Sequence, residues 1–127
     1  MAVTTGTTWD IVLNAAPAPI ARTVSPREAY QAALYGRAVV VDLRSERRRA
    51  AAGYLPSALA AVVGRRELEV WLQESLAQRI LLLDHDGERA VRLARGGDRR
   101  VTAITGGFAA WQGAELPVEH QRSGPSA

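Results

Sequence analysis

Cysteine is absent from this chain of 127 residues, and so is lysine. Without cysteine the chain cannot form a disulfide, a thiolate metal site or a cysteine nucleophile. The compartment cannot be inferred from cysteine usage. All sixteen positive side chains are arginine, and the net charge is only +3. The basic character is therefore carried by guanidinium groups scattered among acidic residues.

Aromatic residues and long apolar runs are also scarce. Aromatic residues make up 6% of the chain, which disfavours a nucleic-acid interface that stacks bases on rings. No apolar run approaches the roughly 18 residues that a membrane span needs. The first ten residues lack the basic and apolar regions of a signal peptide. We therefore expect a cytoplasmic protein with neither nucleic acid nor membrane as a partner.

The length suits a single domain with its own apolar core. The first twenty residues are rich in Thr, Ala and Pro, and Pro17 and Pro19 interrupt any regular structure. We predict an N-terminal arm over residues 1–20, one domain over 21–119, and a flexible polar tail over 120–127.

Short apolar runs alternate with helical patterns along the predicted domain. Ser25 followed by Pro26, with Glu28 three residues after the serine, is a strong helix start. The expected strands cover residues 21–24, 38–43, 58–63, 80–83 and 100–104. The expected helices cover residues 25–35, 46–53, 65–77, 88–95 and 108–113. This alternation predicts an α/β fold with a mostly parallel sheet of about five short strands between two helical layers.

Ligands of open parallel sheets bind at the carboxyl ends of the strands. Asp42, Asp84 and Thr105 fall at the carboxyl ends of three of the predicted strands. We expect the functional site at that edge.

Four segments resemble motifs of the rhodanese family, in the family's order. They are similar to its Asp-Val-Arg strand end, its Gly-His-Ile-Pro-Gly-Ala turn, its Gly-Gly-Phe-x-x-Trp segment and its Leu-Pro-Val ending, and they cover residues 41–44, 53–58, 105–111 and 116–118. The resemblance spans roughly residues 22–119. It implies the rhodanese-like three-layer α/β/α fold.

The same resemblance places the family's catalytic loop on residues 84–89. In rhodaneses a cysteine ends the preceding strand, and a six-residue loop wraps around its sulfur. Here the loop reads Asp84, His85, Asp86, Gly87, Glu88 and Arg89. Asp84 stands at the nucleophile position, and Arg89 lies where the family usually has an anion-binding arginine. The resemblance also suggests Asp42 and Arg44 as binding residues.

Sulfur transfer requires a soft thiolate that stores sulfur as a persulfide. The harder carboxylate of Asp84 forms no stable intermediate with sulfur, so we expect no catalytic residue in the degenerate loop. Instead, Asp84 can accept the loop's amide hydrogen bonds itself. With Asp86 and Glu88 beside it, we predict a filled pocket that repels anions.

Each of these residues also has a simpler structural role. Asp84 can cap the following helix, Arg89 can pair with Asp86 or Glu88, and His85 can be an exposed loop residue. Asp42 can orient Arg44 or the loop backbone. Trp71 and Trp111 suit the core.

Two other readings concern the same loop. Residues 81–87 are similar to the first motif of haloacid-dehalogenase-type phosphatases, in which the first aspartate of Asp-x-Asp-Gly attacks phosphorus. That family has its nucleophile on the first strand, whereas Asp84 follows a later predicted strand. The family also has a phosphate-binding lysine, and this chain contains no lysine. A weak metal site formed by Asp84, His85, Asp86 and Glu88 is the other reading, although neighbours in a tight loop rarely point at one centre.

The sequence therefore favours a catalytically inactive rhodanese-like domain that acts as a binding or regulatory module in a sulfur-metabolism context. Its partner would be a protein or a small anionic ligand, and we expect no cofactor or metal. The alternative is an enzyme with altered chemistry at the same loop, either residual sulfurtransferase-like activity or aspartate-based phosphoryl transfer.

Overall fold

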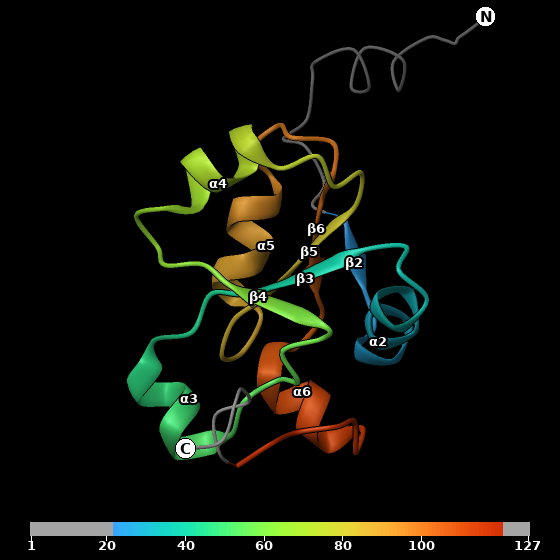
Figure 1. Ribbon diagram of the computed structural model, residues 1–127, viewed down its shortest axis with the longest axis vertical. Coiled ribbons are helices and arrows are strands. Elements are labelled where there is room, and N and C mark those ends of the chain that lie inside the picture. The colour runs from blue at the N-terminus through green and yellow to red at the C-terminus, as the bar shows by residue number, and fades with distance from the viewer. Residues whose placement is uncertain (1–21, 121–127) are drawn as a thin grey trace, which may run out of the picture.

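A parallel five-stranded sheet forms the centre of the molecule in the computed structural model, which describes residues 22–120 (Figure 1). The strand order is β2-β6-β5-β3-β4. The strands are β2 (Thr23–Val24), β3 (Val39–Asp42), β4 (Ala60–Val62), β5 (Ile80–Leu83) and β6 (Val101–Ile104). The predicted N-terminal arm and residues 121–127 of the predicted tail lie outside the described residues.

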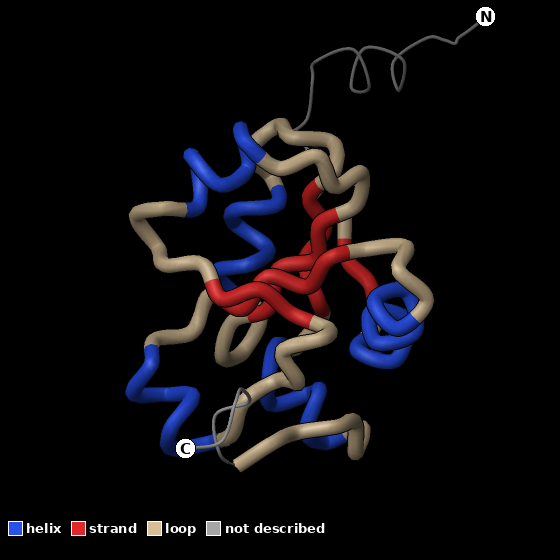
Figure 2. Tube along the Cα trace, in the orientation of Figure 1, coloured by secondary structure: helices blue, strands red, loops and turns tan. Residues whose placement is uncertain are grey.

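Helices connect the strands and cover both faces of the sheet (Figure 2). Parallel strands require such crossovers, which shield both faces from water. The helices are α2 (Pro26–Leu34), α3 (Glu46–Ala52), α4 (Leu68–Glu74), α5 (Glu88–Ala94) and α6 (Gly107–Gly113). The predicted α/β fold with a parallel sheet of five short strands is confirmed.

One face of the sheet packs against α2 and α6. Trp111 of α6 is fully buried there, and its ring meets that of Tyr30 edge-on at a centroid distance of 6.0 Å. The Trp111 indole N–H donates to the carbonyl of Pro117 at 3.0 Å. This contact ties the segment after α6 to the core.

The opposite face packs against α4 and α5. Leu68 of α4 and Ala90 of α5 are buried against Leu82 and Val101 of the sheet. Trp71 packs against this second cluster while remaining half-buried. Both tryptophans therefore contribute to apolar packing, as we expected.

The helix start predicted at Ser25 is present, because its hydroxyl accepts the Glu28 amide at 3.1 Å. The helix predicted over residues 65–77 is shorter. It spans Leu68–Glu74 because Glu67 at its N-cap makes no side-chain cap and Ser75 takes an extended backbone. Among residues 22–120, no helix is long and apolar enough to cross a membrane.

Candidate functional site

The β5–α5 loop begins at the carboxyl end of the central strand β5. Because Ile80–Leu83 are fully buried between the two helical layers, the strand delivers Asp84 to the sheet edge. Asp84 itself is only 5% exposed. A charge with so little access to water requires hydrogen bonds from the protein.

The loop supplies those bonds from its own backbone. Oδ1 of Asp84 accepts the Gly87 amide at 2.5 Å, and Oδ2 accepts the amides of Arg89 at 2.9 Å and Ala90 at 3.1 Å. The carboxylate thus occupies the amide cradle of the loop and caps the first turn of α5. The capping role considered for Asp84 is present, and the prediction that Asp84 fills the cradle agrees with this geometry.

Two glycines allow the loop to pack directly on the start of α6. A Cβ atom on Gly107 would lie 2.6 Å from the Asp84 carbonyl and 2.7 Å from the Gly87 nitrogen. Both glycines adopt positive φ, +60° at Gly107 and +94° at Gly87, a region that side chains disfavour. The Phe108 amide then donates to the Asp84 carbonyl at 2.7 Å. The Gly-Gly-Phe segment at the start of α6 therefore holds the backbone of the β5–α5 loop in place.

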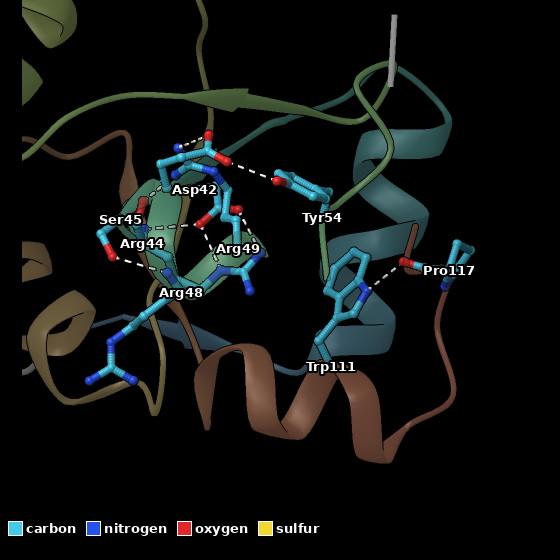
Figure 3. A network of polar contacts seen from close by, with 9 residues as sticks. Asp42, Arg44, Ser45, Arg48, Arg49, Tyr54, Trp111 and Pro117 are labelled. Carbon is cyan, nitrogen blue, oxygen red and sulfur yellow. Dashed lines mark hydrogen bonds and ion pairs between the residues drawn. The ribbon is translucent and has the colours of Figure 1, made fainter. Parts of the chain in front are cut away.

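Asp42 and Arg44 form a buried ion pair next to this loop, shown in Figure 3. Oδ1 of Asp42 accepts both the backbone N–H and the Nε–H of Arg44 at 3.0 Å, and Oδ2 accepts Nη2–H at 2.8 Å. The guanidinium carbon lies 3.8 Å from the centre of the Phe108 ring. Asp42 therefore orients Arg44, the structural role considered for it.

A second arginine extends this network away from the loop. Arg49 is buried and donates to the Arg44 carbonyl and, at 3.4 Å, to Glu46. The Tyr54 hydroxyl donates to the other oxygen of Glu46 at 2.8 Å. Arg48, one position earlier, points away from this network (Figure 3).

A cleft of about 540 Å³ lies over the loop. Five arginines line it, namely Arg44, Arg48, Arg65, Arg89 and Arg92. The lining also includes His85 and three carboxylates, those of Asp84, Asp86 and Glu88. The arginines of the lining outnumber its carboxylates, a balance that the predicted repulsion of anions did not take into account. The sequence argument counted only the loop's own acids, whereas Arg48 and Arg65 come from distant segments.

His85 and Arg89 also belong to the β5–α5 loop segment, residues 84–89. His85 is exposed, as considered, and its carbonyl accepts the Ala109 amide at 3.2 Å. Arg89 forms no ion pair with Asp86 or Glu88 in the described part of the chain. Burial, followed by the positive charge of Arg65, lowers the pKa of Arg89.

Metal binding finds no support in residues 22–120, because no group of three His, Asp or Glu side chains there is arranged to hold an ion. In the haloacid-dehalogenase reading Asp84 is a free nucleophile. Here both of its oxygens are held by backbone amides.

Comparisons with solved structures identify the fold. A rhodanese-related protein from Thermoplasma volcanium superposes with a TM-score of 0.62 at 19% identity, covering 79% of this chain and 99% of that one. A polysulfide-sulfur transferase homodimer from Wolinella succinogenes gives 0.64 at 20% identity, covering 91% and 93%. This chain has a rhodanese-like fold.

The rhodanese-like domain also resembles a protein of another description. A protein of unknown function from Rhodopseudomonas palustris, a possible tyrosine phosphatase, superposes with a TM-score of 0.62 at 26% identity, covering 94% of this chain and 99% of that one. No family model matches the sequence, and no curated protein matches it either.

Proposed function

We propose that this rhodanese-like domain transfers no sulfur and acts as a binding or regulatory module. The observation that carries the proposal is the state of Asp84, whose carboxylate is tied to three backbone amides at the tip of β5. It stands where the resemblance to rhodaneses puts the nucleophile. The chain contains no cysteine that could replace it.

Sulfur transfer at this position fails on chemical grounds. In the transfer from thiosulfate, a thiolate attacks the outer sulfur, the S–S bond breaks, and sulfite leaves with its electron pair. A carboxylate is a poor nucleophile toward sulfur and forms no stable oxygen–sulfur intermediate. The domain would therefore keep the fold of a sulfur carrier without the atom that carries sulfur.

Phosphoryl transfer by Asp84 is the rival proposal, and the possible tyrosine phosphatase among the similar structures gives it some weight. Against it, a nucleophilic carboxylate needs a free oxygen facing the substrate. Asp84 is 5% exposed and uses both oxygens to hold the loop. We therefore favour binding over catalysis.

The test introduces a sulfur atom at position 84. The wild-type chain should show background rates in a thiosulfate:cyanide sulfurtransferase assay. The Asp84→Cys variant, treated with thiosulfate, should gain the mass of one sulfur atom in intact-protein mass spectrometry. Asp84→Ser, of similar size, is the matched control and should gain none.

Turnover by the wild-type chain would refute the proposal. If Asp84→Cys gained no sulfur while remaining folded by circular dichroism, the loop amides would no longer be arranged for sulfur transfer. The missing cysteine would then not be the sole defect of the site.

A further inference from the structure

A groove of about 800 Å³ lies between α4 and α5, on the face of the sheet that these two helices cover (Figure 1). We call it the α4–α5 groove. Its apolar lining consists of Leu68 and Leu72 of α4, Leu93 of α5, and Leu82 and Val101 of the sheet. Leu93 is 37% exposed and Leu72 is half-buried. The groove therefore presents apolar side chains that a bound segment could cover.

Hydrogen bonds hold one wall of this groove in place. Nη2 of Arg100 donates to the carbonyl of Leu72 at 2.6 Å, and Nη1 donates to that of Ser75 at 2.8 Å. The same guanidinium group pairs with Asp98, another residue of the lining, at 2.9 Å. Because the wall is fixed in advance, binding a segment there needs little rearrangement of the protein.

Arg22, the first described residue, lies at the same edge of the sheet as one end of the groove. β2 pairs in parallel with β6, so both strands start at that edge. The Arg22 carbonyl accepts the Ala103 amide at 2.9 Å, and Nη1 of Arg22 donates to the carbonyl of Arg99 at 3.1 Å. Arg99 stands between Asp98 and Arg100, which both line the groove. The residues that precede Arg22 therefore join the domain next to the groove.

Residues 9–13 supply a matching apolar sequence. They read Trp-Asp-Ile-Val-Leu, with four apolar residues out of five. Leu13 lies nine positions before Arg22, a stretch that spans at most about 30 Å. A domain of about 100 residues has a radius of gyration of only about 13 Å, so the whole groove is within reach. A short tether also gives a segment a roughly millimolar effective concentration, an advantage that a separate partner lacks.

We propose that the α4–α5 groove holds residues 9–13 of the same chain, with their apolar side chains against Leu68, Leu72 and Leu93. Any external partner for this surface then has to displace residues 9–13. The inference goes beyond the proposed function and does not depend on it, because the groove and the β5–α5 loop are tested by different measurements.

The absence of cysteine provides the experiment, since an introduced thiol is the only one in the chain. The full chain carrying Leu93→Cys is treated with dithiobis-nitrobenzoate, and the rate of thiol modification is followed by absorbance. Adding Trp9→Ser/Leu13→Ser should speed the reaction about ten-fold or more, because the thiol reacts only in the fraction of molecules whose groove is open. Adding Thr7→Ser/Thr8→Ser, in the same stretch of sequence, is the matched control and should change the rate less than about two-fold.

A second thiol position separates docking from a change in the stability of the domain. Leu34 of α2 is 52% exposed, and α2 packs on the opposite face of the sheet. The modification rate of Leu34→Cys should be the same with and without Trp9→Ser/Leu13→Ser. If both thiols were accelerated equally, the serines would act on the whole domain and the inference would fail.

The dependence on protein concentration identifies the occupant of the groove. Residues 9–13 of the same chain should protect Leu93→Cys equally at low and high concentration. Protection that rises with concentration and is lost in Trp9→Ser/Leu13→Ser would place the segment in the groove of a second copy and overturn the inference. An unchanged rate in that variant would also overturn it. Neither result bears on sulfur transfer, on which the proposed function depends.

Discussion

Two aspartate–arginine pairs share one local geometry at opposite ends of the sheet. Asp42 is the last residue of β3 and Arg44 follows it, whereas Asp98 and Arg100 precede β6 at its amino end. In each pair one carboxylate oxygen accepts the arginine's backbone N–H and Nε–H, at 3.0 to 3.1 Å. The other accepts Nη2–H, at 2.8 Å in the first pair and 2.9 Å in the second.

Their surroundings differ. The side chains of the first pair are both 1% exposed, and those of the second are 29% and 32% exposed. Arg44 stacks on Phe108, whereas Arg100 donates to the carbonyls of Leu72, Ser75 and Ala77. The comparison shows that the Asp-x-Arg spacing sets the local hydrogen bonds. Burial in the fold sets how much free energy of unfolding is lost when they are broken.

Breaking the buried pair should have the largest effect. Asp42→Asn keeps an oxygen for the Arg44 backbone amide but leaves the guanidinium charge buried without a counter-charge. The free energy of unfolding, measured by urea denaturation, should fall by about 3–5 kcal/mol. Replacing both residues, as Asp42→Leu/Arg44→Met, should recover much of this loss. A fall below about 1 kcal/mol for Asp42→Asn would mean that water reaches Arg44.

Breaking the half-buried pair of Asp98 and Arg100 from the arginine side should cost less. Arg100→Gln removes the donors that hold the carbonyls of Leu72, Ser75 and Ala77. The urea midpoint should fall by a smaller amount than in Asp42→Asn, and hydrogen exchange should quicken in α4. Arg99→Gln, on the neighbouring residue, is the control and should change neither. If the urea midpoint fell as far as in Asp42→Asn, burial would not be what decides the cost of breaking these pairs.

The smallest effect should come from Asp98 and depend on pH. Hydrogen bonds from the Arg100 side chain, then from its backbone, lower the pKa of Asp98 below its ordinary value of 3.8. A lowered pKa stabilises the fold above the unfolded-state value, and that gain is lost as the pH falls through the folded-state value. Asp98→Asn should therefore lower the urea midpoint slightly at pH 7 and by less near pH 2, where part of the gain is lost. An equal shift at both pH values would exclude the charge as the cause.

The fold was largely predictable because its signals are local. Ile80–Leu83 is a run of apolar residues bounded by polar ones, and it forms β5 over those residues. Ser25 with Pro26 fixed the start of α2 by their own hydrogen bonding and backbone preference. No strand order was predicted, because the order β2-β6-β5-β3-β4 depends on pairing between segments that are distant in the sequence.

The site was predicted only where its contacts join residues that are close together in the sequence. Asp84 capping its own loop involves residues three to six positions away, within reach of sequence reasoning. The cleft was missed because Arg48 and Arg65 meet Arg89 only after three strands pair in register. In the sequence these arginines are scattered among acidic residues and give no sign that they share a cleft. The spacing Asp-x-Arg, present twice, was the available signal for the ion pairs.

An aspartate at the tip of β5 has a consequence for chemistry in the cell. A thiolate in such a loop is open to peroxides, electrophiles and soft metal ions, and oxidation changes its charge and size. The Asp84 carboxylate undergoes none of these reactions. The loop therefore keeps one covalent form at position 84 under oxidising and reducing conditions alike.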